Sequence, residues 1–148
     1  MPHTRMPAVA GWFTGEEDGF RLLGTRCQAC ASVFFPREDD HCRNPHCAGG
    51  VLEEVPLSRY GRVWSYTDSR YRPPSPYVSN PDLPWVPYTL IAVELEAERI
   101  VVLGQAAPGV TTADLAVGME VEVIPGVLQK DPEAALTTLT TWNWRPRR

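Results

Sequence analysis

The sequence has few of the residues on which most catalytic sites depend. Histidine occurs only three times in the 148 residues, at His3, His41 and His46. No histidine general base is therefore present beyond residue 46. The chain also lacks the Gly-x-Ser-x-Gly and Gly-x-x-x-x-Gly-Lys motifs. A pair drawn from Asp68, Asp82 and Glu94 stays open as an acid/base alternative, but charged residues are mostly solvated surface groups. We expect no catalytic residue and no activity from this chain alone.

Basic residues are in the minority. The sequence has 14 Lys+Arg against 18 Asp+Glu, which gives a net charge of −4. A protein that neutralises many phosphates of a nucleic acid usually has the opposite balance. Nucleic acid is therefore a weak candidate partner, although a local basic patch can exist on an acidic protein.

Long apolar runs are absent as well. No stretch approaches the ~18 apolar residues that a membrane-spanning helix requires. Residues 1–10 also lack the apolar segment of a secretory signal peptide. These features predict a cytoplasmic protein without a membrane partner, whose thiols stay reduced.

The chain does have a concentrated set of cysteines. All four lie between positions 27 and 47, as Cys27, Cys30, Cys42 and Cys47. The Cys-x2-Cys and Cys-x4-Cys spacings let each pair fold around one ion, and the segment between them lets the pairs face each other. Four thiolates close a tetrahedral site, whereas a catalytic zinc keeps one position for water. The pattern predicts a structural Zn²⁺ in a zinc ribbon.

Two alternatives to this site remain. Two disulfides would use the same four cysteines, as expected in a secreted protein. His41 adjoins Cys42 and His46 adjoins Cys47, so an imidazole could replace one thiolate. Neither histidine is required, because four cysteines already complete the coordination.

Strand periodicity dominates the chain after the cysteines. Alternating or β-branched runs predict five strands, over 61–67, 88–95, 99–105, 120–125 and 136–144, with 112–116 as a short helical turn. Five short strands of this kind form a small barrel. The predicted fold is all-β, with an N-terminal rubredoxin-like zinc ribbon followed by a small OB-fold barrel. We expect an arm over 1–22, the ribbon over 23–57 and the barrel over 58–148.

One long segment interrupts the strands. Residues 70–87 contain six prolines together with Tyr71, Tyr77 and Trp85. Prolines reduce the entropy cost of an extended loop, and aromatic side chains provide rigid contact area. The segment is either a contact loop for a partner or a plain rigid spacer.

The order of these features resembles a known family. The chain is similar to DUF35 zinc-ribbon/OB-fold proteins. The similarity rests on an aromatic arm, the two cysteine pairs, the run 61–67, the proline-rich segment and the runs 87–95 and 115–121, in this order. Members typically serve as accessory subunits of thiolase-like enzymes, and some bind acyl-CoA. Actinobacterial members include partners of aldolases that shorten steroid side chains. The resemblance implies a thiolase-like partner in a hetero-oligomer and no catalytic residue.

Contact residues can be suggested for such a complex. Arginine side chains suit bidentate contacts with phosphates. The residues suggested to contact the CoA phosphates or the partner are Arg59, Arg62, Arg70 and Arg72, with Tyr71, Tyr77 and Trp85 as aromatic contacts. A free-standing acyl-CoA-binding module is one alternative. A single-stranded nucleic-acid binder is another, with stacking on Tyr60, Trp64, Tyr66 and Tyr71.

Overall fold

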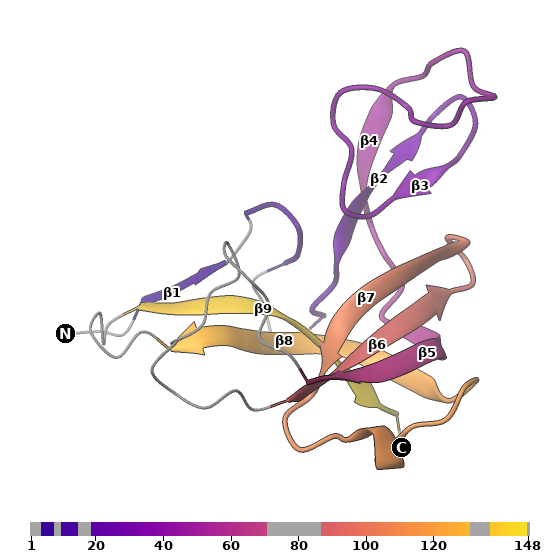
Figure 1. Cartoon of the computed structure of the whole chain (residues 1–148). Coiled ribbons are helices and arrows are strands. Elements are labelled where there is room, and N and C mark those ends of the chain that lie inside the picture. Colours follow the sequence, from indigo (N-terminus) through magenta and orange to yellow (C-terminus); the bar gives the residue numbers. More distant parts are fainter. Residues whose placement is uncertain (1–3, 8–9, 15–18, 71–86, 131–136, 148) are drawn as a thin grey trace.

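The computed structural model describes residues 4–7, 10–14, 19–70, 87–130 and 137–147. Apart from one 3₁₀ turn, η1 (Thr112–Asp114), the regular elements in these ranges are β-strands. They form a three-stranded and a six-stranded sheet, which Figure 1 shows as an upper and a lower unit. The predicted all-β class is confirmed. None of the described segments forms an apolar helix of membrane-spanning length.

The small sheet carries the cysteines. Its central strand β2 (Leu23–Cys27) pairs antiparallel with β3 (Val33–Phe34) and with β4 (Leu52–Pro56). Strand β2 ends at Cys27, so the first cysteine pair lies in the turn that follows it. The second pair lies on the long connection from β3 to β4. This sheet is the predicted zinc ribbon.

The large sheet closes on itself. Its barrel strands are β5 (Tyr60–Ser69), β6 (Tyr88–Leu95), β7 (Ile100–Ala106), β8 (Glu120–Lys130) and β9 (Thr137–Pro146). Strands β5–β6, β6–β7, β5–β8 and β8–β9 pair antiparallel, and β7–β9 pair parallel. The ring therefore has five strands, which is the barrel predicted from the sequence and the architecture of the OB type.

The barrel core follows from the alternation of apolar residues. On β6, the side chains of Ile91, Val93 and Leu95 are fully buried, as expected when every second residue faces inward. Trp144 of β9 is also fully buried. A Cβ atom on Gly104 would lie 2.7 Å from the indole of Trp144. Glycine at that position therefore makes room for the largest core side chain.

The ribbon and the barrel share one hydrophobic core. Phe20, Leu22 and Leu57 are buried and belong to the same cluster as the barrel residues. The Leu57 N–H donates to the Leu22 carbonyl at 2.8 Å, and the Arg21 guanidinium donates to the Leu57 carbonyl at 2.6 Å. Glu98 of the β6–β7 turn accepts hydrogen bonds from the backbone and hydroxyl of Ser58. These contacts fix the ribbon against the barrel.

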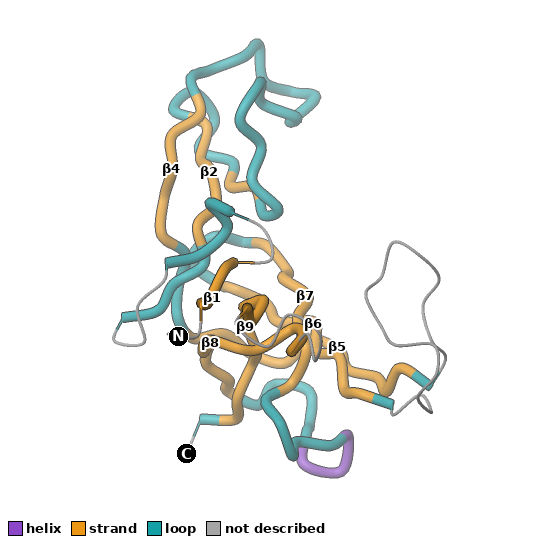
Figure 2. Tube along the Cα trace, turned by 90° about the vertical axis from the view of Figure 1, so that its left-hand side faces the viewer, coloured by secondary structure: helices purple, strands orange, loops and turns teal. Residues whose placement is uncertain are grey.

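The N-terminal arm docks on this same chain. Trp12 packs edge-on against Phe35 with ring centroids 5.5 Å apart, and Trp142 contacts both rings. Residues 4–7 also form a strand, β1 (Thr4–Pro7), which pairs parallel with β9 (Figure 2). The sequence pattern did not predict this strand. The described arm aromatics are therefore part of the fold.

Candidate metal centre and surface sites

The four cysteine sulfur atoms converge on one point. All four Sγ atoms lie within 4.8 Å of one another. The Sγ atoms of Cys27 and Cys47 are 3.9 Å apart, and those of Cys30 and Cys42 are 3.6 Å apart. A tetrahedron with Zn–S bonds of about 2.3 Å has edges of about 3.8 Å. The two separations of 3.9 and 3.6 Å match this edge, so the four sulfurs fit one zinc ion.

The disulfide alternative is wrong for this structure. All four cysteines are free thiols. A disulfide would require a sulfur–sulfur distance near 2.0 Å, far below the separations of 3.6 and 3.9 Å between the closest pairs.

Tight turns place the sulfurs. The Ala31 N–H donates to the Cys27 carbonyl at 2.8 Å, which closes the first turn. In the second pair, the Gly49 N–H points at the Cys47 sulfur at 3.4 Å. A Cβ atom on Gly50 would lie 2.7 Å from the Cys27 sulfur. Any larger residue at this position would therefore displace the sulfur from the cluster.

The electrostatics of the cluster favour a bound cation. The hydroxyl and backbone of Ser32 lower the pKa of Cys30 to about 6. The backbone N–H of Asn44 favours the thiolate of Cys42, but burial and the three neighbouring sulfurs raise its pKa to about 12. The pKa of Cys47 is also raised, although the Gly49 N–H acts in the opposite direction. A divalent ion supplies the charge that lets all four ionise together.

Zinc affinity should therefore increase with pH. Cys42 and Cys47 have raised pKa values, so zinc must displace at least two protons near neutral pH. We expect the affinity to rise by at least about 100-fold for each pH unit between 6.5 and 7.5. Competition with a chelator, corrected for its own protonation, measures this slope. An affinity that does not change with pH would contradict the assignment.

The histidines do not join the cluster. His41 and His46 are both exposed. Among the described residues, the group that could hold a metal consists of the four cysteine sulfurs and includes no imidazole nitrogen. The three-thiolate alternative thus gains no support.

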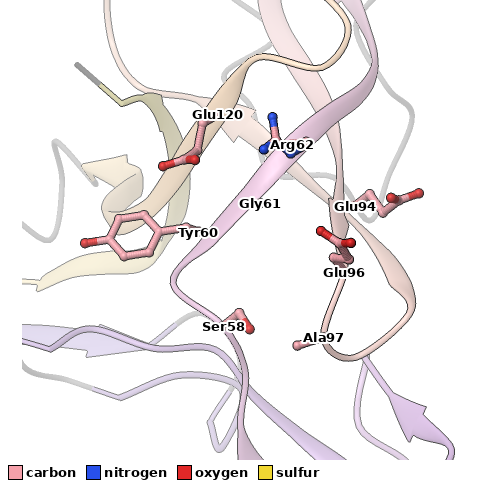
Figure 3. A pocket seen from close by; sticks show the side chains of 8 residues that line it. All are labelled: Ser58, Tyr60, Gly61, Arg62, Glu94, Glu96, Ala97 and Glu120. Atoms are coloured by element: carbon pink, nitrogen blue, oxygen red, sulfur yellow. The ribbon is translucent and has the colours of Figure 1, made fainter.

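The candidate arginines do not form one site. Arg59 lies beside the Tyr60 ring at 5.8 Å, and Arg70 pairs with Asp68 at 3.0 Å. Arg62 lies in a pocket of about 410 Å³, where Figure 3 shows it among Glu94, Glu96 and Glu120. The Arg62 guanidinium donates to the Gly118 carbonyl at 3.2 Å. Three carboxylates line the same pocket, and their negative charge disfavours a phosphate there. The other candidates, Tyr71, Arg72, Tyr77, Trp85 and the acid Asp82, lie outside the described residues.

Two of the proposed stacking residues have ring contacts within this chain. The Arg147 guanidinium lies 4.1 Å from the centre of the Tyr60 ring. Tyr66 is half-buried and packs against the barrel core. A nucleobase would have to compete with Arg147 for one face of Tyr60, which is 39% exposed, and with the core contacts of Tyr66.

An apolar row crosses the outer face of the barrel. Trp64 lies at the bulge of β5, with 60% of its surface exposed, and the adjacent Ser65 pairs with Ala92 of β6. Ala92 in turn pairs with Leu103 of β7, which is 63% exposed. Because side chains of a strand alternate between its two faces, the sequence of β7 could have identified Leu103 as an outward-facing residue. The bulge in β5 that exposes Trp64 could not be predicted from the sequence. We call Trp64, Ala92 and Leu103 the apolar row.

Comparisons with known proteins agree with this architecture. Residues 20–53 match the model of the ChsH2 rubredoxin-like zinc ribbon domain. The chain is 28% identical over 123 residues to a DUF35 domain-containing scaffold protein of Methanocaldococcus jannaschii, across 82% of this chain and 79% of that protein. It is 42% identical over 48 residues to the benzoylsuccinyl-CoA thiolase subunit BbsA of Thauera aromatica, across 32% and 31% of the two chains.

A solved structure extends the likeness to the whole fold. The chain superposes on a chain of the Ltp2-ChsH2(DUF35) aldolase with a TM-score of 0.59 and 28% identity, covering 95% of this chain and 98% of that one. The fold and the cysteine site thus define a zinc-ribbon and β-barrel protein with structural zinc as its cofactor. More particularly, the predicted resemblance to DUF35 proteins is confirmed.

Proposed function

We propose that this chain is a non-catalytic accessory subunit, which binds and supports a thiolase-fold enzyme acting on acyl-CoA thioesters. Its relatives include a scaffold protein and a thiolase subunit, and the similar structure is that of an aldolase assembly. The partner's reaction would be a thiolase or a retro-aldolase step, with steroid side chains as one substrate class that the likeness suggests. Cys27, Cys30, Cys42 and Cys47 would hold the zinc.

The apolar row carries this proposal. Trp64 and Leu103 lie on either side of Ala92, which is itself buried at 8% exposure. Exposed large apolar residues that lie close together are typical of protein interfaces, where tryptophan often dominates the binding energy. Trp64 and Leu103 are two of the most exposed large apolar side chains among the described residues. The row lies on rigid barrel strands, so it needs no ordering before a partner binds.

Replacing the exposed tryptophan should release the partner. The tagged, zinc-loaded protein is used to capture proteins from its host's lysate, and the captured chains are identified by mass. We expect the wild type to retain a thiolase-like subunit. Trp64→Ser should weaken retention by about 30-fold, equivalent to about 2 kcal/mol for a central interface tryptophan.

A matched control separates this effect from a general loss of apolar surface. Val127 is 46% exposed on β8 and lies outside the row. Val127→Ser should keep the captured subunit at the wild-type level. Equal retention by Trp64→Ser and wild type would show that the row is not the binding surface.

A further inference from the structure

One edge of the barrel is open. Strand β7 pairs with β6 from Ile100 to Gln105, but on its other side it pairs with β9 only at Gln105 and Ala106. From this contact, β7 continues toward the ribbon (Figure 1). Among the described residues, no strand pairs with this side of β7 between Ile100 and Gly104. We call this stretch the β7 edge.

The hydrogen bonds along β7 show which backbone groups face outward. The Leu103 carbonyl accepts from the Trp142 indole at 3.2 Å. The Ala107 N–H donates to the Trp144 carbonyl of β9 at 2.8 Å. Residues 103 and 107 therefore face away from β6. Because strand residues two apart point their backbone groups to the same side, the N–H and C=O of Val101 and the N–H of Leu103 are directed to the β7 edge.

The β7 edge lacks the features that protect exposed strand edges. Proteins usually block such edges with charged side chains, proline or a bulge. The outer strand β4 of the ribbon carries two glutamates and a proline. Strand β7, by contrast, has no proline and no charged residue along Ile100–Ala106. An unprotected edge of this kind is a template for an added strand.

The side chains beside this edge are apolar. Val101 is 41% exposed, and Leu103 is the most exposed residue of the strand's large apolar side chains. Next to Val101 lies a groove of about 550 Å³, whose ribbon wall includes Val33 and Phe35. The charged residues that line this groove are all engaged in ion pairs. The surface therefore suits an uncharged, extended segment and not an anionic ligand.

We propose that an extended segment of the thiolase-like subunit adds a strand to the β7 edge. This inference rests on the proposed function, since it names how the partner attaches. The Leu103 side chain belongs to the apolar row, while its backbone belongs to the edge. A strand paired with Val101 and Leu103 would therefore continue the same contact surface. Main-chain hydrogen bonds would supply affinity, and side chains in the groove would supply specificity.

Hydrogen exchange of the full-length, zinc-loaded chain tests the open edge. The Val102 and Gly104 amides face β6, so the Val101 and Leu103 amides should exchange at least about tenfold faster than these two. Binding of the captured thiolase-like subunit should slow exchange at Val101 and Leu103 by at least about tenfold. Slow exchange at Val101 in the free chain would overturn the proposal, and a dimer in light scattering would then identify a second copy as the occupant. Unchanged exchange in the complex would overturn it as well.

A proline at the edge tests the same contact in the capture experiment. Val101→Pro removes an N–H that does not bond β6, and edge strands tolerate proline in this orientation. We expect the variant to fold but to retain the thiolase-like subunit at least about tenfold more weakly, because main-chain hydrogen bonds are lost. Val101→Thr keeps the N–H and the branched shape, so it should lose far less.

A second proline provides the matched control. Val117 is 70% exposed in the turn before β8, where the Met119 N–H donates to the Ala116 carbonyl and Gly118 has a φ of 90°. Proline fits the second position of such a turn, so Val117→Pro should retain the subunit at the wild-type level. Equal losses from both prolines would overturn the proposal. Zinc content and melting temperature verify that each variant is folded.

The outcomes separate this inference from the proposed function. If the wild type captures no thiolase-like subunit, both fail. If Trp64→Ser loses the subunit while Val101→Pro retains it at the wild-type level, the accessory role stands and strand addition is wrong.

Discussion

Cys27→Ser should abolish zinc binding and unfold the ribbon. Cys27 is fully buried at the end of β2, and its sulfur is one corner of the four-sulfur cluster. A structural zinc site contributes on the order of 10–16 kcal/mol at neutral pH. The three short strands of the ribbon cannot replace this contribution. Metal analysis should show close to one zinc per chain in the wild type and almost none in the variant. Loss of dispersed NMR signals over residues 23–56 should accompany it.

The exposed histidine beside the second pair provides the control. His46→Ala should keep one zinc per chain and the same ribbon signals, because His46 lies outside the sulfur cluster. A loss of zinc in His46→Ala would favour the site of three thiolates and one imidazole. A Cys27→Ser protein that stays folded without metal would disprove the structural role of zinc.

Trp144→Ala should strongly destabilise the barrel. Trp144 has no exposed surface and packs in the central cluster. Truncation of a buried tryptophan to alanine costs about 3–5 kcal/mol. The free energy of unfolding of a small protein is only about 5–15 kcal/mol, so the variant would lose much of its stability. Urea denaturation followed by circular dichroism measures the change in the free energy of unfolding.

Trp64→Ala makes the same truncation on the barrel surface. Trp64 is 60% exposed, so its replacement should change the free energy of unfolding by no more than about 0.5 kcal/mol. The two variants therefore separate folding from binding. An equal loss of stability in both would mean that Trp64 supports the core and is not reserved for a partner.

Much of the fold could be predicted because the relevant signals are local. The cysteine spacing predicts the metal cluster directly, since each pair forms its own turn. The alternation over β6 predicts a strand whose observed bounds, Tyr88–Leu95, are those expected. The structure also places the short turn η1 inside the predicted range 112–116.

Other features depend on contacts between distant segments. Strand β1 forms only because β9 offers an edge to it, and residues 4–7 show no strong strand pattern of their own. Phe20 and Leu22 complete the shared core through tertiary packing. Ser58 and Glu98 are far apart in the sequence, so only the placement of the ribbon against the β6–β7 turn reveals their hydrogen bonds. The predicted domain boundaries stay predictions.

Reconstitution from purified components tests the central claim most directly. The zinc-loaded chain and the captured thiolase-like subunit are mixed and separated by size-exclusion chromatography with mass detection, and the thioester reaction is assayed on each fraction. The account predicts a stoichiometric complex, activity in the complex and none in this chain alone. Separate elution of the two chains, or thioester chemistry by this chain without the subunit, would contradict it.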